Sequence, residues 1–178
     1  MIIRVVSWGL GVIRYTDDIA EVGEGMLRGF FVGWPRPASP AQHLAVLHGS
    51  FRAVVAIDST AGRVVGFVTM ISDGVLTAAI PWLEVLPGYQ GRGIGTELMR
   101  RILEGTERFY SVDLLCDAPL QPYYARFGMV PLPGAALRHP AALRGRAIAT
   151  PHAQNAGAPN REAPGCAGGG TSRGSCDR

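Results

Sequence analysis

The residues best suited to chemistry surround a segment in which glycine alternates with other residues. Gly91 and Gly93 lie between an apolar run and a helical pattern of apolar residues that begins at Ile94, and Gly95 is the second residue of that pattern. Glycine is used where the chain turns tightly or where another group approaches the main chain closely. The first amides of a helix lack internal partners and lie at the positive end of its dipole, so they suit an anion such as a pyrophosphate. Arg92 adds a cation at the rim of this candidate anion site.

Three interpretations of this segment compete. A dinucleotide fingerprint G-x-G-x-x-G would need glycine where the chain has Thr96, and the segment follows a hairpin in mid-chain, so this interpretation is set aside. A turn that only allows close packing of a helix on a strand is the general interpretation of a bare glycine motif. The third interpretation is the coenzyme A turn Q/R-x-x-G-x-G/A, which is matched in full by Gln90, Gly91, Arg92, Gly93, Ile94 and Gly95.

The elements that must position this turn are predicted from the patterns on both sides of it. Upstream, residues 2–8 are rich in β-branched side chains and predict a strand. A hydroxyl followed by two acids predicts the start of a helix over about 16–31. A second helix is predicted over 40–48, because Ser39 and Gln42 can form a capping box around a proline at the first helical position.

The next stretch predicts antiparallel strands. Residues 51–58 and 63–72 are apolar, β-branched runs joined by the turn DSTAG, which is a hairpin pattern. A further strand is predicted over 75–87, and Pro81 should bulge or open it because proline has no amide to donate. Beyond the glycine turn, the patterns predict a helix from residue 94, a strand over 111–117, a short helix over 120–128 and a last strand over 129–132.

Length and composition predict one domain followed by a tail. A chain of 178 residues with 47% hydrophobic content can build one good core, and we assign residues 1–138 to it. Residues 139–178 are dominated by Ala, Gly, Pro and Arg, so they are predicted to be a disordered tail. The net charge of +3 comes from scattered basic residues, so we expect neither a nucleic acid partner nor a membrane partner.

Residue types that the chain lacks exclude several function classes. All 17 basic residues are Arg, and the absence of Lys excludes a Walker-type phosphate loop and Schiff-base chemistry. Cys116, Cys166 and Cys176 have neither zinc-site spacing nor the even number of a disulfide set, so we expect no metal site and a reducing, cytoplasmic location. No segment approaches the ~20 apolar residues of a membrane span.

Two separated segments, LEVLPGYQGRGIGTELMRRILE at 83–104 and LQPYYARFGM at 120–129, resemble the GNAT superfamily of N-acetyltransferases. The resemblance covers roughly residues 2–138 and includes the order of the predicted elements. It implies a mixed α/β (α+β) fold, in which a mostly antiparallel central sheet has one splayed parallel strand pair and helices on both faces. It also implies transfer of acetyl from acetyl-coenzyme A to a primary amine by direct attack in a ternary complex, with no metal.

The same resemblance places acetyl-coenzyme A between two parallel strands, at about 82–86 and 111–116. Main-chain amides of the glycine turn would hold the pyrophosphate, and main-chain groups of 84–86 would hold the pantetheine arm and the acetyl carbonyl. Asp117 stands where the family often carries Asn. The residues expected to bind the co-substrate are Val85, Leu86, Gln90, Gly91, Arg92, Gly93, Ile94, Gly95, Thr96 and Asp117.

Two side chains are candidates for proton transfer. Tyr124 matches the tyrosine of the family motif F-Y-x-x-x-G-F that points at the sulfur of coenzyme A, so it is the candidate acid. Its alternative role is core packing, which is the role favoured for Tyr123. Glu84 is the candidate base, because it alternates with apolar residues on a strand and must face either a cleft or solvent. A cleft would favour a raised pKa, although many family members use ordered water and no single base.

The acceptor is open at the level of sequence, and small-molecule and peptide amines both fit. In the family, the first two helices and the loop between them usually select the substrate. Phe31 and Trp34 are therefore candidate substrate residues, with core packing as the alternative, and Trp82 is a further candidate. His43 and His48 are predicted to do no chemistry. A homodimer is an open option, and the alternative functions are a non-catalytic acyl-coenzyme A sensor or interaction module and an acyltransferase for a longer acyl group.

Overall fold

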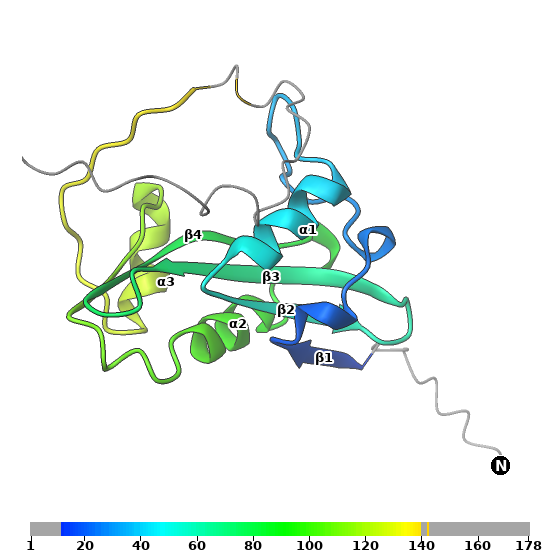
Figure 1. Ribbon diagram of the computed structural model, residues 1–178, viewed down its shortest axis with the longest axis horizontal. Coiled ribbons are helices and arrows are strands. Elements are labelled where there is room, and N and C mark those ends of the chain that lie inside the picture. The colour runs from blue at the N-terminus through cyan, green and yellow to red at the C-terminus, as the bar shows by residue number, and fades with distance from the viewer. Residues whose placement is uncertain (1–11, 140–141, 143–178) are drawn as a thin grey trace, which may run out of the picture. The chain divides into compact units, whose positions relative to one another are not determined.

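A five-stranded sheet forms the centre of this computed structural model, which describes residues 12–139 and residue 142 (Figure 1). The strands follow one another in the order of the sequence, and all neighbours are antiparallel except the last pair, which is parallel. This arrangement confirms the predicted mostly antiparallel sheet with one parallel pair. The strands are β1 (Ile13–Thr16), β2 (Arg52–Asp58), β3 (Arg63–Ser72), β4 (Thr77–Val85) and β5 (Ser111–Asp113).

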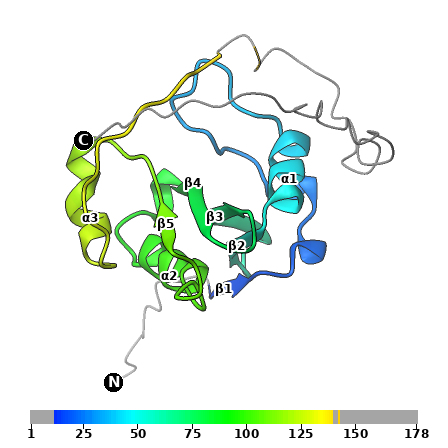
Figure 2. The same ribbon diagram turned by 60° about the vertical axis from the view of Figure 1, so that its left-hand side comes forward.

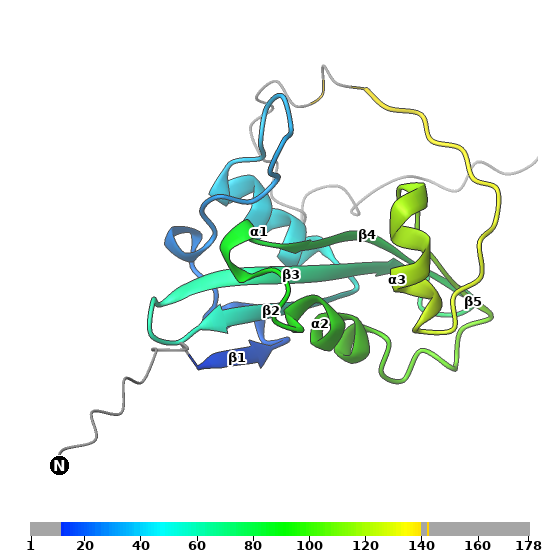
Figure 3. The same ribbon diagram turned by 180° about the vertical axis from the view of Figure 1, so that it is seen from behind.

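Helices cover both faces of this sheet, as predicted (Figure 2). Figure 2 shows α1 (Pro40–Gly49) on one side and α2 (Ile94–Ile102) on the other. The short helix α3 (Gln121–Ala125) lies beside β5 at the end of the sheet (Figure 3). None of the helices in the described part of the chain has the length and apolar character needed to cross a bilayer.

Alternation along the strands builds one core on each face of the sheet. In β2, Val55 and Ile57 pack into the core under α1, whereas Val54 and Ala56 pack into the core under α2. A β-bulge between β2 and β3 follows Ala56 and precedes Ile57. Gly66 lies beside this bulge, and a Cβ there would come within 3.1 Å of the Leu98 side chain. The absent side chain therefore allows α2 to approach the sheet closely.

The parallel pair is short, and the two strands part where proline interrupts β4. The pairing runs from Thr77 opposite Ser111 to Ala79 opposite Asp113. Beyond it, the register of β4 with β3 shifts around Pro81, which confirms the predicted bulge. Because proline has no amide for a ladder, the rest of β4 continues along β3 without pairing to the segment after β5. This divergence gives the predicted splayed opening.

The predicted helix over 16–31 is wrong. The chain forms two short 3-10 turns, η1 (Ile19–Glu21) and η2 (Glu24–Met26). The capping signal is real, because the Asp18 side chain accepts a hydrogen bond from the Ala20 amide at 3.0 Å. Three glycines within seven positions, at 23, 25 and 29, make a longer helix unfavourable, and Gly29 adopts a φ of 88° that ends any helix.

Two downstream predictions also differ from the structure. The strand predicted over 111–117 ends at Asp113, because the chain diverges from β4 there. Residues 129–132 form no strand, and Pro131 has no amide to donate to one. The strand predicted over 2–8 and nearly all of the predicted tail lie outside the described residues, so the domain boundary at 138 stays a prediction.

Candidate active site

The glycine turn between β4 and α2 has a conformation that glycine makes possible. Gly91 has a φ of 73°, and Gly93, the N-cap of α2, has a φ of 80°. A Cβ at either position would meet nothing within 4 Å, so these two glycines are not explained by close packing. Gly95 differs, because a Cβ there would lie 3.1 Å from the Tyr123 hydroxyl. Two glycines therefore serve the left-handed backbone and one serves packing.

The N-terminus of α2 has no side-chain cap. Gly93 offers no side chain to accept from the first helical amides, which by the geometry of a helix have no partners within it. The guanidinium of the exposed Arg92 lies 5.2 Å from the centroid of the Tyr89 ring, beside these amides. The turn therefore presents several N–H donors, the positive end of a helix dipole and one cation on an open surface.

Tyr89 anchors the turn to the rest of the sheet, a role that the sequence did not reveal. Its hydroxyl donates to Asp58 Oδ2 at 2.9 Å, at the end of β2. The other Asp58 oxygen accepts hydrogen bonds from the amides of Thr60 and Ala61. The Ala61 amide and the Tyr89 hydroxyl lower the pKa of Asp58, and the bond to Asp58 raises the pKa of Tyr89. The sequence signal was an acid followed by Ser-Thr at a strand end, which favours such a turn.

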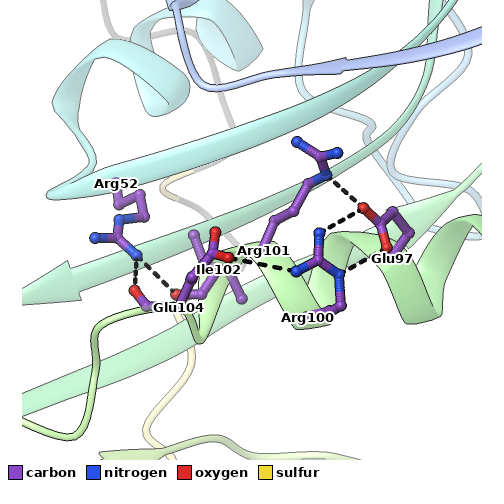
Figure 4. Close-up of polar contacts among 6 residues, drawn as sticks. All are labelled: Arg52, Glu97, Arg100, Arg101, Ile102 and Glu104. Atoms are coloured by element: carbon purple, nitrogen blue, oxygen red, sulfur yellow. Dashed lines mark hydrogen bonds and ion pairs between the residues drawn. The ribbon is translucent and has the colours of Figure 1, made fainter.

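Charged side chains join the first turn of α2, which carries Glu97, to its last turn, and Arg52 binds its C-terminal end (Figure 4). Glu97 accepts from Arg100 at 2.9 Å and from Arg101 at 2.6 Å, and the hydrogen bonds from Arg100 are the largest cause that lowers the pKa of Glu97 to about 2. Arg52 of β2 donates to the main-chain carbonyls of Ile102 and Glu104, where the helix ends. A cation at a helix C-terminus is favourable, so this network holds the helix whose N-terminus remains uncapped.

The end of β4 offers main-chain groups next to the turn. Leu86 is already engaged, because its amide donates to the Val65 carbonyl at 2.9 Å and its carbonyl accepts from the Tyr89 amide at 2.8 Å. Val85 faces the other way, and its carbonyl accepts from the Gln90 side chain at 2.9 Å. Because successive residues of a strand point their amides to opposite edges, the Val85 amide faces the splayed side of β4.

A cavity of about 390 Å³ opens on the α1 face of the sheet, beside β4. It brings together the predicted base Glu84, all three predicted substrate residues and two of the predicted co-substrate residues. The lining residues are Phe31, Val32, Trp34, Phe67, Trp82, Leu83, Glu84, Val85, Pro87 and Gln90. Sequence reasoning had not singled out Val32, Phe67, Leu83 or Pro87.

Three aromatic rings form one wall of this cavity. The Trp34 ring centroid lies 5.4 Å from that of Phe31 and 5.2 Å from that of Trp82. Phe31 is also a core residue, because it is only 4% exposed and packs edge-on against His43. Phe31 therefore packs in the core and also lines the cavity, whereas Trp34 and Trp82 are half-buried.

The Glu84 carboxylate holds the segment that carries Phe31. Its two oxygens accept the amides of Phe31 at 2.8 Å and of Val32 at 3.1 Å. Among the described residues, Phe31 is the one non-glycine residue with a positive φ, 61°. Such a conformation is costly for a bulky side chain and needs support from its surroundings. The two hydrogen bonds from the strand provide that support.

The two tyrosines of α3 lie on the other side of the sheet from this cavity. Burial, with Tyr123 and Cys116 nearby, raises the pKa of Tyr124 to about 12. Tyr124 packs against the core under α2 and does not line the cavity. The buried Tyr123 hydroxyl reaches Gly95, and it has no hydrogen-bond partner among the described residues. Thr96 lies close enough to oppose the rise that burial causes in the pKa of Tyr123, but its geometry falls short of a hydrogen bond.

A match to a protein-family model identifies the family of this chain. Residues 19–129 match the model described as the acetyltransferase (GNAT) family, which is more than half of the chain. The chain belongs to the GNAT family of acetyltransferases. Enzymes of this family use acetyl-coenzyme A as co-substrate and transfer its acetyl group. The predicted family, fold and enzyme class are therefore confirmed.

Solved structures agree with this assignment. A Deinococcus radiodurans R1 protein assigned as an acetyltransferase is 38% identical, with a TM-score of 0.72, over 76% of this chain and 94% of that one. A GNAT-family protein of Xanthomonas campestris is 20% identical, with a TM-score of 0.61, over 77% and 100% of the two chains. Glucosamine-6-phosphate N-acetyltransferase from Arabidopsis thaliana shares the fold at 12% identity and a TM-score of 0.54, over 72% and 98%. No curated protein sequence matches the chain significantly.

The donor set of this GNAT chain fits acetyl-coenzyme A. Bare backbone at Gly91 and Gly93 leaves open space where a side chain would block a phosphate. The buried Tyr123 hydroxyl without a partner lies at the same helix end. Asp117 is exposed and is the N-cap residue of the 3-10 turn Ala118–Leu120, where its side chain makes no capping hydrogen bond. Within residues 12–139 and residue 142, no group of three or more His, Cys, Asp or Glu side chains is arranged to hold a metal ion.

Proposed function

We propose that this GNAT chain transfers acetyl from acetyl-coenzyme A to a primary amine by direct attack in a ternary complex. The observation that carries the proposal is the uncapped N-terminus of α2 at Gly93, which adjoins the splayed end of β4. The amides of 90–95 and the Arg92 guanidinium would hold the pyrophosphate, and Thr96 would border it. The Val85 main chain would hold the pantetheine arm. Leu86 would contribute its side chain only, since its main-chain groups are engaged.

When bound, acetyl-coenzyme A supplies the acetyl group as a thioester, which a primary amine attacks directly. Main-chain amides aimed at the acetyl oxygen would each contribute about 2.7–4 kcal/mol, as oxyanion donors do in other acyl transfers. The Val85 amide on the splayed side of β4 is the donor best placed for this role. Asp117, near the end of the segment after β5, would border the pantetheine from the other wall.

Glu84 would receive the proton that the amine loses, directly or through one water. It is the one ionisable side chain among the ten residues that line the cavity. Each carboxylate oxygen has two acceptor sites, so both oxygens can hold the amides of Phe31 and Val32 and still accept from an ammonium group. Its negative charge would also attract the cationic form of the amine.

Tyr124 would donate a proton to the departing sulfur. A pKa of about 12 keeps this phenol protonated at neutral pH, as a donor must be. Tyr124→Phe should lower kcat roughly 100-fold, because general acid catalysis typically contributes 10²–10⁴-fold. The affinity for acetyl-coenzyme A should stay within about twofold, since the ring remains. Tyr110→Phe, at a tyrosine that is 93% exposed, is the matched control and should keep full activity.

The test is release of free thiol from acetyl-coenzyme A in the presence of primary amines, followed by mass spectrometry of the amine product. Amine-dependent release with an N-acetylated product supports the proposal. Tight binding of acetyl-coenzyme A without release for any amine would contradict it, and would favour the alternative of an acyl-coenzyme A sensor. Faster release from a longer acyl thioester would contradict the choice of acetyl.

A further inference from the structure

We infer that the acceptor carries its single primary amine on an apolar, aromatic-sized body, and that it has neither a carboxylate nor a second cationic group. This inference rests on the proposed function and concerns the cavity beside β4. The charges in the cavity, its three aromatic rings and the contacts that hold its wall together select the acceptor.

The charges of the cavity select the charge of the ligand. Glu84 is the one ionisable side chain among the ten lining residues, and Gln90 is the one amide side chain. A carboxylate on the acceptor would meet Glu84 and would find no Arg or His among the lining residues to pair with. A second ammonium group would find no second carboxylate there. Burying an unpaired charge is unfavourable, so both kinds of acceptor are disfavoured.

The aromatic wall selects the body of the ligand. Phe31, Trp34 and Trp82 have ring centroids 5.2 to 6.0 Å apart, so they form a continuous surface. Such a surface buries a flat apolar group and attracts a nearby cation through the ring faces. Glu84 lies beside Trp82 on the same face of β4, two residues along the strand. An amine a few bonds from an aromatic ring can therefore reach the carboxylate while its ring contacts the tryptophans.

Contacts within the protein hold the wall in place. The hydrogen bonds from the Phe31 and Val32 amides to Glu84 fix the loop at its most constrained residue. Phe31 is further held against Phe67 and His43, with centroid separations of 5.9 and 5.1 Å. A wall held by such contacts loses little entropy on binding and discriminates between ligands by shape. Its volume of about 390 Å³ suits one small molecule.

The experiment compares three acceptors with the full chain and acetyl-coenzyme A. They are 2-phenylethylamine, phenylalanine, which adds only a carboxylate, and 1,4-diaminobutane, which replaces the ring by a second amine. We expect kcat/KM for 2-phenylethylamine to exceed both others by at least roughly tenfold. Calorimetric titration with each of the three amines, which needs no turnover, should show the tightest binding for 2-phenylethylamine. Equal or better use of phenylalanine or 1,4-diaminobutane would overturn the inference.

Variants separate this inference from the proposed function. Trp34→Leu and Trp82→Leu should each raise KM for 2-phenylethylamine roughly tenfold while the Kd of acetyl-coenzyme A is unchanged. Phe51→Leu, at an exposed phenylalanine that does not line the cavity, is the matched control and should change neither value. If both tryptophan variants behave like the wild type, the aromatic wall does not select the acceptor, although acetyl transfer stands. Thiol release with none of these three amines, while acetyl-coenzyme A still binds, would overturn the inference. No binding of acetyl-coenzyme A would overturn the proposed function itself.

Discussion

The two longest helices in the described part of the chain begin in opposite ways. At the start of α1, the Ser39 hydroxyl accepts from the Gln42 amide at 3.2 Å, and the Gln42 side chain accepts from the Ser39 amide at 2.9 Å. A proline fills the first helical position. At the start of α2, Gly93 provides no capping side chain and adopts a left-handed backbone. The N-terminus of α1 is capped by its own side chains and is called the closed end below. The N-terminus of α2 has no side-chain cap and is called the open end.

This difference indicates what each end does. A side-chain cap typically stabilises a helix by about 1 kcal/mol, and α1 takes that stabilisation. At α2, the same amides remain available to a ligand, and Arg92 and Tyr89 flank them. Arg52 holds the other end of the helix, and the pairs of Glu97 with Arg100 and Arg101 link its first turn to its last. An open end on a well-anchored helix is what an anion site requires.

The largest expected effect comes from closing the open end. Gly93→Asp should weaken the binding of acetyl-coenzyme A roughly 1,000-fold, because a carboxylate would occupy the amides and repel the pyrophosphate. Gly93→Asn is the matched control, since Asn tolerates a positive φ as well as Asp and carries no charge. Calorimetric titration measures both, after circular dichroism has verified folding. An Asp variant that binds as well as the Asn variant would contradict the assignment of this end to an anion.

The second effect is a loss of stability at low pH that is caused by His43, a buried residue of α1. His43 is 1% exposed among aromatic rings, and burial lowers its pKa from 6.5 to about 4. The unfolded chain therefore binds a proton between these values that the folded chain does not. This difference in proton binding contributes about 3 kcal/mol to the free energy of unfolding. The contribution is fully present above pH 6.5 and is lost as the pH falls toward 4. Urea unfolding at several pH values, compared between wild type and His43→Leu, measures it.

His43→Leu removes the titrating group, so the difference between the two proteins should vary with pH in this window. A constant difference between pH 4 and 6.5 would show that His43 is not held neutral. The acetyl-coenzyme A site should respond little to this change, because it lies on the other helix.

A smaller effect is expected from opening the closed end. Ser39→Ala should lower the free energy of unfolding by about 1 kcal/mol, because it removes the cap of α1. The Kd of acetyl-coenzyme A should not change, since α1 does not contribute to the turn. Chemical unfolding and calorimetry test the two halves of this prediction. Loss of binding in this variant would remove the contrast between the two helix ends.

The smallest effect is expected from the ion pairs that run along α2 from Glu97. Glu97→Gln should lower Tm by about 1–2 °C, because exposed ion pairs contribute little. Hydrogen bonds from Arg100 and Arg101 hold the pKa of Glu97 at about 2, so any stabilisation is present above pH 4.5 and is lost as the pH falls toward 2. Thermal unfolding at pH 7 measures the change. A decrease of more than about 8 °C would mean that this network carries the fold.

Sequence reasoning succeeded where the signal is local. The capping box of α1, the hairpin of β2 and β3 and the interruption of β4 at Pro81 each follow from a few adjacent residues. The helix predicted over 16–31 failed because its start signal was weighed above the glycines that follow. Gly66 gave a usable signal that was missed, since an isolated glycine in an apolar strand indicates a bulge or a close approach.

In the candidate site, too, sequence reasoning found the features with a local signal and missed those that depend on tertiary packing. The glycine turn and the cavity residues Glu84, Trp34 and Trp82 were predicted from motif and pattern. The grip of Glu84 on the Phe31 amide joins residues 53 positions apart, so no local pattern encodes it. The position of the Tyr123 hydroxyl at Gly95 depends on how α3 packs against α2, which is likewise a tertiary fact.

The most direct test of the account is calorimetric titration of the wild-type chain with acetyl-coenzyme A. The account predicts binding at one site per chain with micromolar affinity, and its loss in Gly93→Asp at a concentration where Ser39→Ala still binds. Absence of binding by the folded wild type would contradict the central claim. The open end of α2 would then be a feature of packing alone.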